Sequence, residues 1–188
     1  MWVSLKAYLF FCFFNHIICI YSSNLNKNLR ENIIYIPQRA KLFNRTLREN
    51  LTYGLPPEIT VEHILKFLKD NGFIELEQIF INRMDDKVGK NGSSYSGGQI
   101  AMIWFLRAAM QNAKLIITDE ASAALDPQSR KQIKKMIDIM SKDKSIIVIT
   151  HDEEMTVGMD RIITFEKGKI ISDKANNKNS NSTNNGWN

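Results

Sequence analysis

"KLIITDE", residues 114–120, contains an apolar run of strand length and ends in two adjacent carboxylates. A second run of this kind, SIIVIT, covers residues 145–150. Such runs suit strands that are buried on both faces of a parallel sheet. Between them, residues 127–142 show the spacing of an amphipathic helix, with Pro127 in its first turn. The order strand, helix, strand predicts a right-handed crossover and therefore an α/β fold.

Three further segments extend this pattern on both sides. NIIYIP, residues 32–37, is a short β-rich run stopped by proline. TVEHILKFLKDNGF, residues 60–73, has helical spacing, a threonine cap and an Asn-Gly stop. DRIITFEKGKII, residues 160–171, predicts a hairpin with a Lys-Gly turn. We therefore expect a folded zone over residues 29–173.

The composition is that of an ordinary globular domain. The 188 residues, of which 44% are hydrophobic and 24% charged, can form one domain with a sizeable core. The net charge of +5 is spread along the chain, which favours a solvated surface over a nucleic-acid partner. The two cysteines, Cys12 and Cys19, offer neither a metal-ligand spacing nor a disulfide framework, so the rest of the chain fits a reducing compartment.

Two zones of different composition flank the folded zone. Residues 1–23, MWVSLKAYLFFCFFNHIICIYSS, are apolar and aromatic. They are interpreted as a membrane anchor, as a signal-like segment, or as an artefact of an alternative start or a misread exon. A cleaved signal ranks last, because secretion would turn NRT, NLT and NGS into glycosylation acceptors. Residues 174–188 are polar and Asn-rich and predict a disordered tail.

Titratable side chains follow both apolar strand runs. Asp119 and Glu120 come at the end of the first run, and His151 follows the second. Because ligands of open parallel sheets bind beyond the carboxyl ends of the strands, we expect these side chains to meet at one edge. One carboxylate suits Mg²⁺, and a second can orient a water for phosphoryl transfer. The alternative is that the acidic pair only caps the next helix.

SYSGGQ, residues 94–99, places two glycines at the start of a helix. The run that follows, residues 100–110, is apolar almost all round, as in a buried helix, with Arg107 as its one charge. A helix N-terminus carries unpaired N–H groups and a partial positive charge, and bare glycines let an anion approach it. Ser96 would add a hydroxyl donor. The alternative is a loop that simply turns into a core helix.

Together these segments resemble the nucleotide-binding domain of ABC (ATP-binding cassette) transporters, over residues 29–172. SYSGGQ resembles the family signature LSGGQ, with Tyr95 where leucine is usual. Four more segments resemble family motifs in the family's order: IPQ (36–38, the Q-loop), LIITDE (115–120, the Walker B strand), SAALD (122–126, the D-loop) and ITHD (149–152, the switch-histidine loop). LFNRTLRENLTYG, residues 42–54, and VGKNGSSYSGGQ, residues 88–99, look most like the exporter type.

The resemblance implies a P-loop NTPase-like parallel sheet with a helical signature subdomain, and ATP and Mg²⁺ as ligands. It also implies a role for each matching residue. Gln38 would sense the γ-phosphate and Mg²⁺, Asp119 would hold Mg²⁺ through water, Glu120 would polarise the attacking water, His151 would contact the γ-phosphate, Asp126 would contact the partner domain, and Ser96, Gly97, Gly98 and Gln99 would act on ATP.

One family motif has no counterpart in the sequence. The P-loop, G-x-x-x-x-G-K-[ST], wraps the phosphates with backbone amides, yet no glycine precedes Gly54. We therefore expect the P-loop strand and helix to be lacking, with residues 1–23 in their place. Three hypotheses follow: an ATPase domain of an exporter represented by an N-terminally incomplete chain, a non-hydrolysing module that supplies its signature in trans, or an inactive fragment.

The resemblance also implies partners at the membrane. They are a second nucleotide-binding domain, in a homo- or heterodimer, and a transmembrane domain that would select the transported substrate. RAKLFNRTLRENLTY, residues 39–53, sets Leu42, Phe43 and Leu47 among basic residues, where such a domain would dock. At least one of these three side chains is expected to pack inside instead. We expect membrane association with the ATPase domain facing the cytosol.

Overall fold

A computed structural model describes residues 7–13, 16–22 and 32–175 of the chain. The chain divides into two compact units. The core unit is Lys27–His151, and the terminal unit combines Met1–Asn26 with Asp152–Asn188. Every residue to which the sequence assigns a site role lies in the core unit, so the fold of this unit positions the candidate site.

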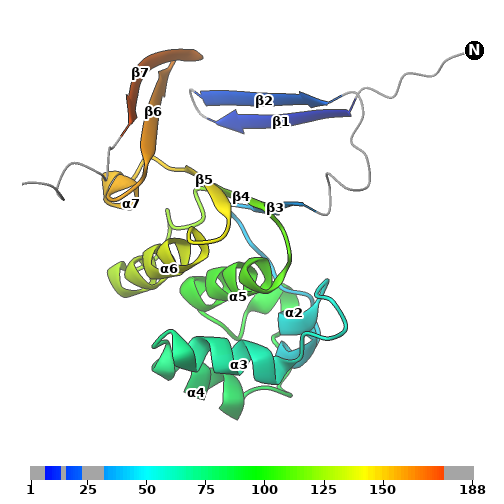
Figure 1. Cartoon of the computed structure of the whole chain (residues 1–188). Helices are drawn as coiled ribbons and strands as arrows, with labels where there is room; N and C mark the ends of the chain where they lie inside the picture. Colours follow the sequence, from blue (N-terminus) through cyan, green and yellow to red (C-terminus); the bar gives the residue numbers. More distant parts are fainter. Residues whose placement is uncertain (1–6, 14–15, 23–31, 176–188) are drawn as a thin grey trace, which may run out of the picture. The chain divides into compact units, whose positions relative to one another are not determined.

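The core unit alternates strands with helices, as labelled in Figure 1. Its elements in chain order are β3 (Ile33–Ile36), α2 (Leu47–Thr52), α3 (Val61–Asp70), α4 (Ile74–Asn82), the 3₁₀ turn η1 (Lys90–Gly92), α5 (Gly97–Met110), β4 (Leu115–Asp119), α6 (Pro127–Met140) and β5 (Ser145–Ile149). The predicted α/β class is thereby confirmed.

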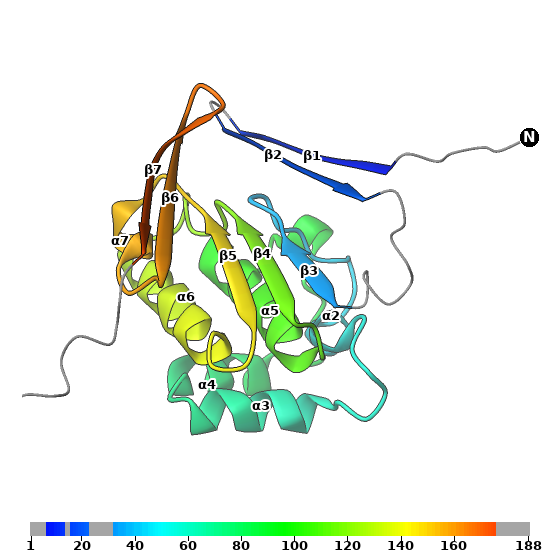
Figure 2. The same cartoon turned by 45° about the horizontal axis from the view of Figure 1, so that its top comes forward.

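The three strands of the core unit form a parallel sheet in the order β3-β4-β5. The register aligns Tyr35 with Ile117 and Ile117 with Ile147, so these side chains share one face of the sheet. All helices of the core unit lie on one side of this sheet, with α5 and α6 directly against it (Figure 2). The strand, helix, strand order predicted from the two apolar runs is confirmed.

Burial differs between the two apolar strands. Ile116, Ile117 and Thr118 of β4 are each less than 5% exposed, as expected for a central strand. The prediction that β5 is buried on both faces is wrong, because Ile147 is 41% exposed. The reason is its position: β5 ends the three-stranded sheet, and the helices of the core unit cover the other face.

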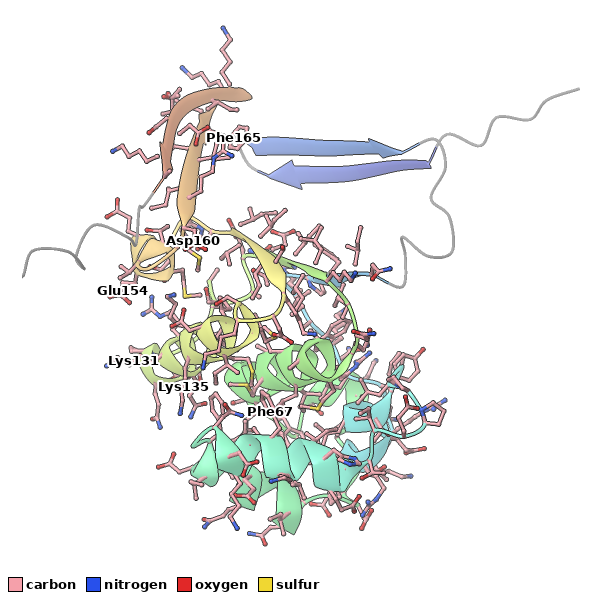
Figure 3. All side chains as sticks on the ribbon, viewed as in Figure 1. Phe67, Lys131, Lys135, Glu154, Asp160 and Phe165 are labelled. Atoms are coloured by element: carbon pink, nitrogen blue, oxygen red, sulfur yellow. The ribbon has the colours of Figure 1, made fainter. Side chains whose placement is uncertain are left out.

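The helical part of the core unit follows the predicted caps. α3 begins after Thr60, whose backbone N–H donates to Nδ1 of His63 at 3.1 Å, and it ends before Gly72 at a positive φ of 68°. Lys135 of α6 donates to the Gly72 carbonyl at 3.1 Å, and its ammonium lies 4.5 Å from the centre of the Phe73 ring. Side chains fill the space between α6, α5 and α3 (Figure 3).

The loop that follows β3 is anchored by buried polar contacts. Asn50 is fully buried; its amide oxygen accepts from the Phe43 N–H at 2.9 Å, and its NH₂ donates to the carbonyls of Phe43 and Thr46. The Trp104 indole N–H donates to the Lys41 carbonyl at 3.1 Å. These bonds attach the segment after Gln38 to α2 and α5.

The terminal unit contains two antiparallel hairpins and a short helix. They are β1 (Ala7–Phe13) with β2 (His16–Ser22), α7 (Glu153–Thr156), and β6 (Arg161–Glu166) with β7 (Lys169–Ala175). Lys167 and Gly168, with φ of 46° and 75°, form the predicted Lys-Gly turn. Residues 174 and 175, predicted to begin the tail, still belong to β7, and residues 176–188 lie outside the described residues.

The apolar N-terminal zone is described as two strands, β1 and β2, while residues 1–6, 14–15 and 23 lie outside the description. Among the residues that the structure describes, no helix has the length and apolar character needed to span a bilayer.

Candidate functional site

The carboxyl ends of the three parallel strands bring together four of the predicted site residues. Asp119 ends β4, Glu120 follows it, Gln38 lies two residues after β3, and His151 lies two residues after β5. Gln38 donates its amide N–H to Glu120 Oε2 at 2.6 Å, and Nδ1 of His151 lies 3.0 Å from Glu120 Oε1. Each oxygen of the Glu120 carboxylate therefore has its own partner from a different strand end.

The backbone at Glu120 is also constrained. Its φ of 44° lies in the left-handed region, which a residue with a side chain rarely adopts. Its N–H donates to the Ile149 carbonyl at 2.8 Å, across to the end of β5. Such strain persists only where surrounding contacts impose it, and it occurs frequently at active sites. The carboxylate is thus held in place from both its backbone and its side chain.

Asp119 has a different environment from its neighbour. The Tyr35 hydroxyl donates to Asp119 Oδ2 at 2.7 Å, while Oδ1 is buried with no hydrogen-bond partner among the described residues. Burial raises the pKa of the Asp119 carboxyl, the Tyr35 bond opposes the rise, and the charge of Glu120 adds to it. Burial and the contact with Asp119 likewise raise the pKa of Tyr35 above its ordinary value.

Sequence reasoning missed Tyr35. The signal that could have found it is the sheet register: Tyr35 aligns with Ile117, and Ile117 lies two residues before Asp119 on the same face. Tyr35 is one residue before the end of β3, and its side chain is long enough to reach the carboxylate at the end of the neighbouring strand β4.

The donor atoms at this edge fit a magnesium ion in part. Mg²⁺ commonly uses one or two carboxylates, keeps several waters and takes its remaining ligands from substrate phosphates. The Asp119 carboxylate is only partly satisfied, because its buried Oδ1 lacks a donor among the described residues; a cation at this edge would meet its Oδ2, and the Gln38 and Glu120 side chains lie at the same edge. No group of three or more His, Cys, Asp or Glu side chains within the described residues could bind a metal ion alone.

The signature segment forms a capped helix start. Ser96 is the N-cap of α5: its Oγ accepts from the Gln99 N–H at 3.2 Å, and Gln99 Oε1 accepts from the Ser96 N–H at 3.0 Å. This reciprocal pair is a capping box. Because its Oγ acts only as an acceptor in this bond, the Ser96 hydroxyl proton stays available to a ligand.

The two glycines of the signature have different surroundings. A Cβ on Gly97 would make only an ordinary contact, 3.4 Å from Leu125. A Cβ on Gly98 would lie 2.1 Å from Ser129 Oγ and 2.6 Å from Ser129 Cβ. The sequence predicts that both glycines allow an anion to approach. The structure adds a second reason for Gly98, which is the close packing of α5 against α6.

Asp126 is the N-cap of α6. Its Oδ1 accepts from the Ser129 N–H at 2.9 Å, and its Oδ2 accepts from the Ser129 hydroxyl at 2.6 Å. Both bonds keep the pKa of the carboxyl below its usual range. A pocket of about 180 Å³ brings Asp126 together with Ser96 and Gln99, so the starts of α5 and α6 line one cavity.

Tyr95, which stands where the family signature has leucine, is a buried residue. It is 7% exposed, and the Arg83 guanidinium lies 4.2 Å from the centre of its ring. Its hydroxyl oxygen is buried without a hydrogen-bond partner in the described part of the chain, and burial raises its pKa. The extra bulk therefore packs inside the core unit.

The predicted docking patch is smaller in the structure. Leu42 and Leu47 are 4% and 0% exposed, so they belong to the core and cannot meet a partner. Phe43 is 45% exposed and stacks on Tyr53, which is also 45% exposed, with 4.4 Å between the ring centres. The exposed apolar surface of residues 39–53 is thus this aromatic pair.

A parallel sheet with a glutamate held between a glutamine and a histidine at its carboxyl edge, in a domain that also contains a glycine-rich helix start, is typical of a nucleotide-binding α/β domain. The particular family follows from comparison with known proteins. The chain belongs to the ABC transporter family, whose model matches residues 18–123.

Relatives and a solved structure agree with this assignment. The ATP-dependent lipid A-core flippase of Aliivibrio fischeri is 36% identical over 148 residues, which are 77% of this chain and 25% of the flippase. The flippase of the same name from Haemophilus influenzae is 34% identical over 143 residues, 76% of this chain and 24% of that protein. A bacterial Atm1-family ABC exporter with ATP bound shares the fold, with a TM-score of 0.70 at 21% identity over 85% of this chain and 29% of its own. The chain thus spans about a quarter of the length of these flippases.

Proposed function

We propose that this chain contributes the ATP-hydrolysing machinery of an exporter-type ABC transporter. The observation that carries the proposal is the Glu120 carboxylate, bonded to Gln38 at 2.6 Å and in contact with His151 at 3.0 Å. A carboxylate held in this way can orient a water molecule in line with a phosphoryl group. The similarity to exporters of the flippase type supports the same role.

The other site residues would act around this glutamate. Gln38 and His151 would hold its carboxylate in position and then contact the γ-phosphate of ATP. Asp119 and Gln38 would hold Mg²⁺, which when bound neutralises developing charge on the phosphates. We propose that Ser96, Gly97, Gly98 and Gln99 contact ATP on a second ABC domain, with Asp126 near the same interface.

The sequence contains no P-loop, so these 188 residues hold no loop to cradle the phosphates. We therefore expect the purified chain to bind ATP very weakly. Calorimetric titration with Mg-ATP tests this point, and a micromolar dissociation constant would contradict it. The catalytic proposal then needs a context that provides a P-loop.

A chimera provides that context. Residues 32–175 would replace the matching part of the Aliivibrio fischeri flippase, an ATP-dependent protein whose remaining residues, including those that bind the ATP phosphates, stay in place. We expect phosphate release from ATP, and Glu120→Gln should reduce it at least about 100-fold, the usual effect of losing a general base. Glu154→Gln is the matched control, since Glu154 belongs to α7, an element to which no site role is assigned. A folded, ATP-binding chimera that is inactive, or equally active with Glu120→Gln, would disprove the proposal.

We also propose that Phe43 and Tyr53 contact a transmembrane domain at the cytosolic membrane face. The stacked pair is exposed, and Arg45 and Arg48 lie near it in sequence, so an apolar contact with a polar rim is available. Phe43→Ser in the chimera should weaken the stimulation of ATP hydrolysis by the transported substrate. Unchanged stimulation would contradict this contact.

A further inference from the structure

Tyr35 is a residue of the sheet edge that the proposed function leaves without a role. We propose that the Tyr35 hydroxyl and a divalent cation compete for the carboxylate of Asp119, so that Tyr35 sets how tightly the edge holds its metal. This inference rests on the proposed function, which makes Asp119 a metal ligand. It adds a residue that tunes the affinity of the site.

The geometry of the Asp119 carboxylate supports this competition. The Tyr35 hydroxyl donates to Asp119 Oδ2 at 2.7 Å. The other oxygen, Oδ1, is shut off from solvent. A hydrated cation that arrives at the strand ends therefore meets Oδ2, the oxygen that already accepts the hydroxyl proton. The hydrogen bond occupies one lone-pair direction of this oxygen and draws on its negative charge, so a cation that binds there competes with it.

The electrostatics favour a tight bond in the absence of a cation. Asp119 is partly desolvated and lies next to Glu120, so its negative charge gains from any donor. Hydrogen bonds to a charged acceptor are stronger than neutral ones. Without the Tyr35 hydroxyl, the carboxylate of Asp119 would lose this side-chain donor, while its Oδ1 already lacks a partner among the described residues. A cation would then be its best remaining partner.

The side chain of Tyr35 lies outside the helix-packed core. It is 36% exposed and lies on the sheet face away from the helices of the core unit, the face that it shares with its neighbour Ile117 and with the exposed Ile147 of β5. A change of rotamer would release Oδ2 without disturbing the buried residues of α5 and α6. The hydroxyl can therefore act as a displaceable ligand.

Manganese is the probe for the test, because its free concentration is read directly by electron paramagnetic resonance. The full chain is titrated with Mn²⁺ at pH 8 in four forms: unchanged, Tyr35→Phe, Asp119→Asn and Tyr53→Phe. Tyr53→Phe is the matched control, since it removes the hydroxyl of a comparably exposed tyrosine. We expect Tyr35→Phe to bind Mn²⁺ about fivefold more tightly, the value of one net hydrogen bond.

The remaining variants distinguish the competition by Tyr35 from the metal role of Asp119. Asp119→Asn should weaken binding at least about tenfold, and Tyr53→Phe should leave it unchanged. If Asp119→Asn has its effect but Tyr35→Phe binds no more tightly than the unchanged chain, the competition is wrong while the metal role of Asp119 stands. If Asp119→Asn binds Mn²⁺ normally, both fail. Tyr35→Leu should match Tyr35→Phe, and a thermal unfolding curve of each variant confirms that it folds.

Discussion

The sheet edge and the signature segment are built in opposite ways. At the sheet edge, the side chains come from three different strand ends. Glu120 is 82 residues from Gln38 and 31 residues from His151 in the sequence, and they meet only because the sheet is parallel. In the signature, Ser96 and Gln99 bond to each other within one turn. The first site depends on the whole core unit, whereas the second is set almost entirely by local sequence.

This contrast has one exception, at Gly98. It belongs to the signature, yet its missing Cβ is required by Ser129 on another helix. We expect Gly98→Ala to destabilise the chain by about 2 kcal/mol, the usual cost of overpacking. Helix propensity alone would favour alanine by about 1 kcal/mol, so a net loss must come from this contact. Urea unfolding followed by circular dichroism measures the change.

Gly97→Ala is the matched control for this prediction. Its Cβ would lie 3.4 Å from Leu125, an ordinary contact, and the helix gains an alanine. The free energy of unfolding should be unchanged or slightly higher. Equal effects of the two substitutions would show that close packing at Gly98 is not what makes the second glycine necessary.

The second prediction tests how local the signature is. Ser96→Ala removes the N-cap of α5, and we expect it to lower the free energy of unfolding by about 1 kcal/mol. Ser94→Ala, an exposed serine two residues earlier, should change it by less than about 0.5 kcal/mol. A Ser96→Ala variant as stable as Ser94→Ala would mean that the capping box does not stabilise the helix start.

The third prediction concerns the departure from the family signature. Because the Tyr95 hydroxyl is buried without a partner among the described residues, Tyr95→Phe should raise the free energy of unfolding by about 1 kcal/mol. The ring would stay in place under Arg83. Chemical denaturation measures the gain, and Tyr53→Phe, on an exposed ring, should show none. A loss of stability in Tyr95→Phe would mean that the hydroxyl has a partner after all.

The same contrast explains what the sequence could predict. The strands, the α3 caps and the Lys-Gly turn depend on local patterns, and the structure confirms them. The meeting of Glu120 with His151 follows from the two apolar runs and the rule for parallel sheets, whereas only the resemblance to the family pointed to Gln38. Pattern alone could not show that Ile147 is exposed, because burial depends on which elements lie against a strand. Leu42 and Leu47 failed as docking residues for the same reason.

Tyr35 and Gly98 each make a contact that the sequence pattern did not predict. Both act through a single partner on a distant element, Asp119 in one case and Ser129 in the other. The register of β3 on β4 makes the first contact foreseeable once the sheet is known. The second depends on how closely α5 approaches α6, which spacing in the sequence does not encode.

The smallest expected effect tests the electrostatics of the sheet edge. Burial raises the pKa of Asp119 in the folded chain above its unfolded value, so the folded state favours the protonated form. The stability that this group contributes is therefore present below the unfolded pKa, near 3.9, and is lost as the pH rises through the folded pKa. Asn has the shape of the carboxyl without the charge, and Asp119→Asn should escape this loss.

We therefore expect Asp119→Asn to match the unchanged chain near pH 3.5 and to be more stable at pH 7, by less than about 1 kcal/mol because the group is partly exposed. Urea midpoints at the two pH values measure the difference, and the other carboxylates cancel because both chains contain them. The opposite sign, a variant that is less stable at pH 7, would mean that the bond from Tyr35 outweighs burial and the charge of Glu120. In that case a cation would have to compete with a stronger bond at Asp119, so this measurement also bears on how readily the edge accepts its metal.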